Sequence, residues 1–283
     1  MASDWLDLPA PPALPGLYLR AALRRAVTGR TLPNRGLRCQ VEVNPEHLAR
    51  YRQICGFRDD GRLPATYPHV LAFALQLKLL TEQGFPFPLL GLVHLENRIR
   101  VMRPLRGLGP FVVSVEVNNL AAHEKGAVFS LITRLQDPLG PLWEGDSRIL
   151  CRDLTLEGPV IERSEEAALQ LFEVDSWLAP ANIGRAYARV AGDYNPIHLS
   201  ATSARLFGFP HAIAHGLWNK ARSLAALSQH LPAAGYAMDV RFQKPVLLPA
   251  TLRLRASEPA AHGQFSLTGK DDLPHMAGSW QLI

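Results

Sequence analysis

A carboxylate and an imidazole lie five residues apart in the segment that reads Gly192-Asp-Tyr-Asn-Pro-Ile-His198. Pro196 fixes its own φ and biases Asn195 away from the helical region, so this segment should form a rigid turn. On such a turn, the side chains of Asp193 and His198 could converge on one small volume and hold a water molecule between them. We therefore predict an acid/base pair that can activate water.

Each of these residues also has a structural interpretation. Asp193 could accept a hydrogen bond from the amide of Asn195 in an Asx turn. A single histidine such as His198 is more often a partly buried structural residue than a catalyst. Asn195 could be a plain turn residue or a group that orients water or substrate. The combination of all three residues around one proline favours the catalytic interpretation.

A helix should begin at Gly216, where a run of mostly apolar residues follows a loop. Because glycine has no side chain, a substrate carbonyl can approach its backbone amide, and the helix dipole adds positive potential there. We predict the amide of Gly216 as the donor to an oxyanion.

The same order of residue types occurs twice along the chain. Tyr51 and Gly56 align with Tyr187 and Gly192 at one offset, since 187 − 51 = 136 and 192 − 56 = 136. Phe57 then stands where the second copy has Asp193, so the first half should be catalytically silent.

Each copy is followed by a loop with proline and histidine, an apolar helix and several strand-like patterns. The first helix is expected over residues 67–80, and the strands over residues 92–102, 111–120, 127–135, 238–242, 251–256 and 264–270. A helix followed by antiparallel strands, repeated once, indicates an α+β fold in which a curled sheet wraps a central hydrophobic helix in each half. We place the boundary in the linker 156–166, which gives the halves 1–160 and 161–283.

Composition excludes several classes of protein. The 30 basic and 25 acidic residues are interspersed without a Lys/Arg run, so no nucleic-acid partner is expected. The longest apolar stretch, residues 67–80, is shorter than the roughly 20 residues that cross a bilayer, so no membrane association is expected. Cys39, Cys55 and Cys151 have no C-x-x-C spacing, which favours a reducing cytoplasm over a disulfide framework.

His211 and His215 are four residues apart and could face the same way on a helix, as metal ligands do. The residue after His211 is alanine, where zinc peptidases of this pattern have glutamate, and Pro210 and Gly216 indicate a loop. We therefore expect no metal site here.

The segment from Tyr187 to Trp218, with GDYNPIH followed by Ala204, resembles the signature of hydratase 2 and the MaoC-like dehydratases, which add water to enoyl thioesters. Residues 240–246 are similar to a strand of the same family. The resemblance implies a double hot-dog fold. In it, the degenerate N-terminal half accommodates the acyl chain and the C-terminal half supplies the catalytic pair. It also implies that His215 lines the entrance to the active site.

On this resemblance we expect reversible hydration of trans-2-enoyl-CoA to (R)-3-hydroxyacyl-CoA, or the reverse dehydration, by Asp193, His198 and Gly216. No metal or organic cofactor is expected, since coenzyme A is part of the substrate. Basic residues of the second half could meet its phosphates, namely Lys220, Arg222, Arg241 and Lys244.

Two alternatives stay open at this point. The chain could dehydrate a specialised hydroxyacyl thioester with a branched, dicarboxylic or carrier-protein-bound acyl group. It could also be a non-catalytic module that binds acyl thioesters. Two fused repeats could pair again, so we expect a homodimer.

Overall fold

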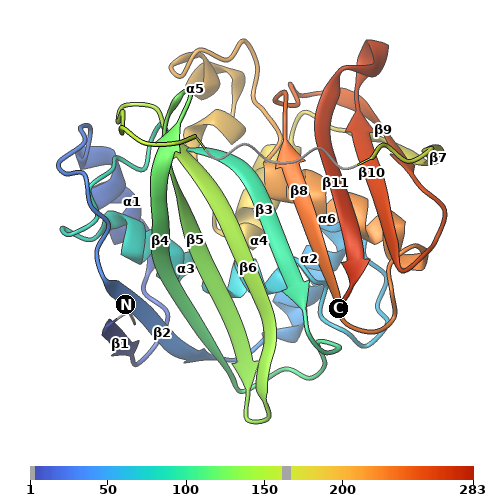
Figure 1. The fold of residues 1–283 in the computed structure, drawn as a ribbon, viewed down its shortest axis with the longest axis horizontal. Coiled ribbons are helices and arrows are strands. Elements are labelled where there is room, and N and C mark those ends of the chain that lie inside the picture. Colours follow the sequence, from blue (N-terminus) through green and yellow to red (C-terminus); the bar gives the residue numbers. More distant parts are fainter. Residues whose placement is uncertain (1–3, 161–166) are drawn as a thin grey trace.

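The computed structural model describes residues 4–160 and 167–283. Its strands form one 11-stranded sheet in the order β1-β2-β4-β5-β6-β3-β8-β11-β10-β9-β7. The helices lie together on one face of this sheet, which curls around them (Figure 1).

The first half contains β1 Asp4–Leu8, α1 Leu14–Leu23, β2 Arg35–Val41, α2 Pro45–Cys55, α3 Tyr67–Thr81, β3 Val93–Val101, β4 Phe111–His123, β5 Gly126–Asp137 and β6 Gly140–Cys151. The second half contains β7 Phe172–Ala179, α4 Ile183–Ala191, η1 Pro196–His198, α5 Ala201–Arg205, α6 Gly216–Ala226, η2 Leu227–Gln229, β8 Tyr236–Phe242, β9 Ala250–Ala256, β10 His262–Thr268, η3 Lys270–Asp272 and β11 Pro274–Leu282.

The two halves of the sheet have the same strand order. Towards the centre it is β2-β4-β5-β6-β3 in the first half, with β1 added outside β2 at the edge, and β7-β9-β10-β11-β8 in the second. The halves join through antiparallel pairing of β3 with β8, in which Asn97 lies opposite Val240. One continuous sheet with the same element order on each side of a central seam is the predicted α+β arrangement.

Equivalent glycines end equivalent helices. Gly56 caps α2 and Gly192 caps α4, each with φ of 79°. This left-handed conformation is the one that glycine adopts most easily, and it turns the chain sharply at the end of each helix. The turn after Gly192 carries the candidate acid/base pair.

The central helix of the first half was expected over residues 67–80 and is found as α3. Leu75 and Leu79 are fully buried in the core, and the helix packs on β2, β4 and β5. Helices α2 and α4 contact each other at the centre of the molecule, where the rings of Tyr51 and Tyr187 lie 6.3 Å apart.

The sequence did not predict strands β1, β2, β6, β7 and β11. The sequence of β6 contains two glycines and three charged residues, and that of β11 contains proline and glycine, so neither has a clear apolar alternation. Pairing on both sides, with β5 and β3 for β6, holds such a segment in the sheet.

The predicted boundary between residues 160 and 161 adjoins residues 161–166, which lie outside the described residues, and it stays a prediction. Over the described ranges, no helix is long and apolar enough to cross a membrane.

Candidate active site

The turn after α4 is built by its own side chains. The amide of Asn195 donates to Oδ1 of Asp193 at 3.1 Å, and the amide of Ile197 donates to Oδ1 of Asn195 at 3.4 Å, which caps η1. Asp193 is therefore an Asx-turn residue, as its structural interpretation has it. One of its carboxylate oxygens serves the turn, and the side chain keeps about a third of its surface exposed, at 34%. The turn thus holds the carboxylate in place and leaves it accessible.

His198 is buried at the end of this turn, with 8% of its surface exposed. Its Nδ1 lies 2.8 Å from the carbonyl oxygen of Ile213. A carbonyl can only accept, so Nδ1 carries the hydrogen and Nε2 carries the lone pair. The backbone fits tightly here, because a Cβ on Gly184 of α4 would lie 2.0 Å from the carbonyl oxygen of His198.

Burial lowers the pKa of His198 below its ordinary value of 6.5, while the charge of Asp193 and the bond to Ile213 oppose this shift. The lowered pKa keeps the ring neutral near pH 7, so Nε2 can accept a proton.

His215 lies directly against His198. The two rings are stacked with centroids 3.6 Å apart, and Nε2 of His215 donates to the backbone oxygen of Asp193 at 3.0 Å. Burial and repulsion from His198 hold the pKa of His215 well below its usual range. Only 3% of the residue is exposed, so it supports the pair from within the protein. The family resemblance implied that His215 lines the entrance to the site, and its burial does not agree with that.

Helix α6 begins at Gly216, as predicted, with His215 as its N-cap. The first amides of a helix have no partner within it, so they can bind an oxyanion. A Cβ on Gly216 would lie 2.9 Å from the ring of Phe242, which explains why this position is glycine.

Asp193, His198 and His215 each offer a ligand atom, and these atoms lie within 4.8 Å of one another. One water molecule with hydrogen bonds of ordinary length can bridge such a gap. The exposed His211 is not part of this group. His211 and His215, which are four residues apart in the sequence, therefore do not converge on one site.

Sequence reasoning missed Tyr18 of α1, because it is 176 residues away from its partner on the turn. Its hydroxyl accepts a hydrogen bond from the amide of Tyr194 at 2.8 Å and donates to the carbonyl oxygen of Gly192. The first half therefore holds the turn from Asp193 to His198 in the second half.

His69 and His94 of the first half are influenced by the charge of Asp193, and sequence reasoning missed them. Burial lowers the pKa of His69 to about 4 and that of His94 to about 3, and the charge of Asp193 opposes both shifts. The repeat offers a signal for His69, since it corresponds to His215 at an offset of 215 − 69 = 146.

The structure contradicts the prediction for Lys220. This residue is fully buried, and its Nζ donates to the carbonyl oxygen and Oδ1 of Asn97 at 3.0 and 2.6 Å. Burial lowers its pKa to about 7. An ammonium enclosed in this way cannot reach a phosphate in solvent.

The other three predicted basic residues differ in whether their charged groups are free to contact a phosphate. The guanidinium of Arg222 donates to Asp175 at 2.7 Å and lies over the ring of Trp177, so it is engaged within the protein. Arg241 and Lys244 are exposed, and their contact with phosphates stays a prediction.

The chain is similar to known enzymes over nearly its whole length. Residues 167–268 match the model of the MaoC-like domain. The 3-hydroxyacyl-thioester dehydratase X of Mycobacterium tuberculosis is 35% identical over 277 residues, which cover 95% of this chain and 98% of that protein. The peroxisomal enoyl-CoA hydratase 2 of Arabidopsis thaliana is 26% identical over 193 residues, with 60% of each chain covered.

Solved structures agree in fold. The crystal structure of HtdX from M. tuberculosis has a TM-score of 0.73 and 31% identity, with 88% of this chain and all of that chain (100%) covered. Another protein of M. tuberculosis, described as a double hot-dog fold, has a TM-score of 0.58 at 12% identity, with 92% and 96% covered, which shows the fold alone. The predicted double hot-dog fold is thereby confirmed. With the dehydratase aligned from end to end, the chain belongs to the MaoC-like dehydratases, a family of hydro-lyases.

Proposed function

We propose that the chain catalyses the reversible hydration of trans-2-enoyl-CoA to (R)-3-hydroxyacyl-CoA, with Asp193 and His198 as the acid/base pair. The observation that carries this proposal is the short distance between the side chains of Asp193 and His198. A carboxylate oxygen of Asp193 and a ring nitrogen of His198 lie within 4.8 Å of each other, beside the first turn of α6. This spacing suits one water molecule held between them.

The neutral His198 supports its role as the base. With its hydrogen donated from Nδ1 to Ile213, Nε2 is free to take a proton from the bound water as the water oxygen bonds to the β-carbon. Asp193 orients the same water through its accessible carboxylate. The protonated His198 then gives this proton to the α-carbon, so His198 ends the cycle neutral and Asp193 ends it ionised, as they began. Dehydration runs through the same steps in reverse.

Negative charge develops on the thioester oxygen during this addition. The amide of Gly216 would donate a hydrogen bond to that oxygen, since Gly216 begins α6 and carries no side chain. Removal of one such donor from comparable sites costs roughly 2.7 to 4 kcal/mol of transition-state stabilisation. The helix dipole acts in the same direction.

The similar proteins support the class of substrate. The relative from M. tuberculosis is named a 3-hydroxyacyl-thioester dehydratase, and the one from A. thaliana an enoyl-CoA hydratase; the two names describe opposite directions of one reaction. We propose coenzyme A as the thioester carrier, with the exposed Arg241 and Lys244 near its phosphates. The three cysteines are free and buried, which suits the reducing cytoplasm proposed here.

The test is the loss of enoyl absorbance with trans-2-butenoyl-CoA and trans-2-decenoyl-CoA, followed by an (R)-specific dehydrogenase to identify the product. Asp193→Asn should lower kcat at least 100-fold without unfolding the protein. The matched control is Asp271→Asn at an exposed turn residue of η3, where asparagine tolerates the positive φ of 54°. This control should retain the wild-type rate.

Two outcomes would contradict the proposal. Folded wild-type protein that binds enoyl-CoA but turns over neither substrate would point to a specialised thioester or to a binding module. A rate that is lost in EDTA and restored by a divalent ion would assign the cluster of Asp193, His198 and His215 to a metal, since one carboxylate and two imidazoles also suit such an ion.

A further inference from the structure

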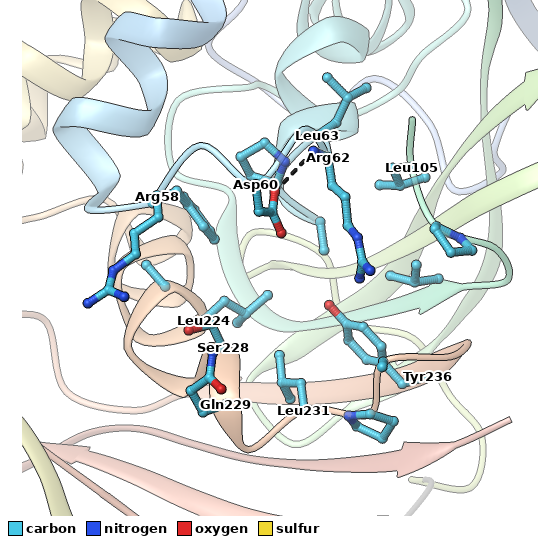
Figure 2. Close-up of a pocket in the computed structure, with 18 of the residues that line it drawn as sticks. Arg58, Asp60, Arg62, Leu63, Leu105, Leu224, Ser228, Gln229, Leu231 and Tyr236 are labelled. Atoms are coloured by element: carbon cyan, nitrogen blue, oxygen red, sulfur yellow. Dashed lines mark hydrogen bonds between the residues drawn. The ribbon is translucent and has the colours of Figure 1, made fainter. Parts of the chain in front are cut away.

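A second pocket lies away from the acid/base pair, with a volume of about 580 Å³. Its walls come from both halves of the chain. The loop between α2 and α3 and the end of β3 belong to the first half, and the C-terminal part of α6 with the segment before β8 belongs to the second (Figure 2). Pockets of a few hundred Å³ are the usual size for small-molecule sites.

This pocket is the counterpart of the active site under the repeat. The loop that begins at Phe57 follows Gly56 as the catalytic turn follows Gly192. Each loop also meets the central helix of the opposite half. A Cβ on Gly192 would touch Phe73 of α3, and a Cβ on Gly56 would touch Arg222 of α6. The fold therefore builds the same kind of site twice, at the two ends of one pseudo-twofold arrangement.

The site in the first half lacks the residues of the acid/base pair but still contains a pocket. Phe57 stands where the catalytic half has Asp193. The loop is also shorter by ten residues, because 69 − 56 = 13 whereas 215 − 192 = 23. The longer loop of the second half contains η1 and α5. Without them the first half lacks the acid/base pair, and its loop borders an open pocket.

The pocket is separate from the active site. Phe57 on its wall stacks on Tyr51, and Tyr51 contacts Tyr187, which in turn contacts His215 of the catalytic cluster. Tyr51 and Tyr187 are both buried in the core. A ligand in the pocket is therefore divided from the acid/base pair by packed aromatic rings.

The pocket has a mixed lining with a positive side. Most of the residues that line it are apolar, among them Leu63, Leu105, Leu224 and Leu231. Of the nearby charges, Asp59 is paired with Arg52, and Oδ1 of Asp60 accepts from the amide of Arg62. Among the described residues, the guanidinium groups of Arg58 and Arg62 have no carboxylate partner in a salt bridge. Figure 2 shows the side chain of Arg62 directed across the pocket at the hydroxyl of Tyr236.

We propose that this pocket is a second, non-catalytic ligand site that takes a molecule with one aliphatic chain and an anionic end group. The apolar part of the lining would bury the chain, and Arg62, with Arg58 at the rim, would bind the anion. A free fatty carboxylate and an acyl-CoA share this chemistry, and both are small molecules that a dehydratase of acyl thioesters encounters.

The test is titration of the full-length protein with dodecanoate, below its micellar concentration, by isothermal calorimetry. Arg62→Gln should weaken binding at least tenfold, and Ala225→Phe, which fills the pocket from α6, should abolish it. Arg50→Gln on an exposed face of α2 is the charge-matched control and should bind as the wild type does. Dodecanol, which has the chain without the charge, should bind at least tenfold more weakly than dodecanoate.

Further arms separate this site from the proposed function and identify the source of the ligand. Asp193→Asn should keep dodecanoate binding, while Arg62→Gln and Ala225→Phe should keep the hydration rate, so each proposal can fail alone. Dodecanoyl-CoA is then added to the Asp193→Asn protein with dodecanoate bound, with and without the Arg62→Gln change. Displacement of dodecanoate only when Arg62 is intact would identify an acyl-CoA as a ligand. No displacement would leave the free carboxylate as the ligand. Binding that persists in Arg62→Gln and Ala225→Phe, or equal binding of dodecanol, would overturn the proposal.

Discussion

The imidazole rings of His198 and His215 are stacked at 3.6 Å between centroids, with 24° between their planes, and both are buried. Each ring gives its one hydrogen to a backbone carbonyl, that of Ile213 for His198 and that of Asp193 for His215. Two protonated rings at this distance would repel each other, so the stack favours a neutral pair. His215 thereby supports His198 with its ring and the turn that carries Asp193 with its hydrogen bond.

His215→Phe should separate these two contributions. Phenylalanine can keep the ring stack and the contact with Tyr187 but cannot donate to the backbone of Asp193. We expect kcat to fall 10- to 100-fold with KM changed less than threefold, because a shift of about 1 Å at a catalytic group can cost a factor of about 100. Steady-state kinetics on decenoyl-CoA checks this, with the exposed His211→Phe as the control. An unchanged kcat would show that the hydrogen bond to Asp193 does not position the turn.

Stability should fall in acid because several half-buried or buried histidines are held in the neutral form. The folded pKa is about 4 for His69 and about 3 for His94, against 6.5 for an ordinary histidine. Between these values the unfolded chain binds more protons than the folded one, so stability is full above pH 6.5 and is lost as pH falls towards 4. Each such group contributes at most about 1.4 kcal/mol per pH unit.

Urea unfolding at pH 7.5, 6, 5 and 4.5 measures this slope. His69→Gln should make it shallower, since one proton uptake is removed, whereas replacement of the exposed His211 should leave it unchanged. A free energy of unfolding that is constant from pH 7.5 to 4.5 would contradict the burial of these rings.

Local patterns were enough to predict some parts of the molecule. The helix found as α3 was visible because apolar residues predominate over residues 67–80, and the turn from Asp193 to His198 because a proline and two turn residues lie within six positions. The start of α6 at Gly216 follows from the same local logic. In these cases the neighbours that fix the structure are also neighbours in sequence.

Contacts between distant segments could not be predicted in this way. Tyr18 meets the catalytic turn from 174 residues away, and Lys220 is enclosed by Asn97 at a separation of 123 residues. A lysine on a helix is usually solvated, and nothing in its own segment shows that the seam between β3 and β8 will bury it. Only the assembled sheet brings these pairs together.

The position of Lys220 gives a prediction about coenzyme A. We compare KM for decenoyl-CoA with KM for the decenoyl thioester of N-acetylcysteamine, which lacks the phosphates. Lys244→Gln and Arg241→Gln should raise KM for the CoA ester about fivefold and leave the short thioester unchanged, as expected for a contact worth roughly 1 kcal/mol. Lys220→Met should alter both KM values by the same factor. A selective effect of Lys220→Met would restore it as a phosphate ligand.

Tyr18→Phe tests whether the first half of the chain fixes the catalytic turn of the second. The hydroxyl bridges the carbonyl oxygen of Gly192 and the amide of Tyr194, on either side of Asp193. Its loss leaves both backbone groups without this partner, and each hydrogen bond contributes about 0.5–1.5 kcal/mol. We expect the free energy of unfolding to fall by about 1–2 kcal/mol and kcat to fall about tenfold, measured by urea unfolding and by decenoyl-CoA hydration.

The matched control is Tyr194→Phe, which keeps the backbone amide and its edge contact with the ring of Tyr18. It removes only a hydroxyl from a side chain that is 42% exposed, so stability and kcat should both stay near wild type. If Tyr18→Phe lowers stability but leaves kcat unchanged, α1 holds the halves together without positioning Asp193. If both fall together, the degenerate half acts in catalysis by shaping the turn, although it contributes no group of its own to the acid/base pair.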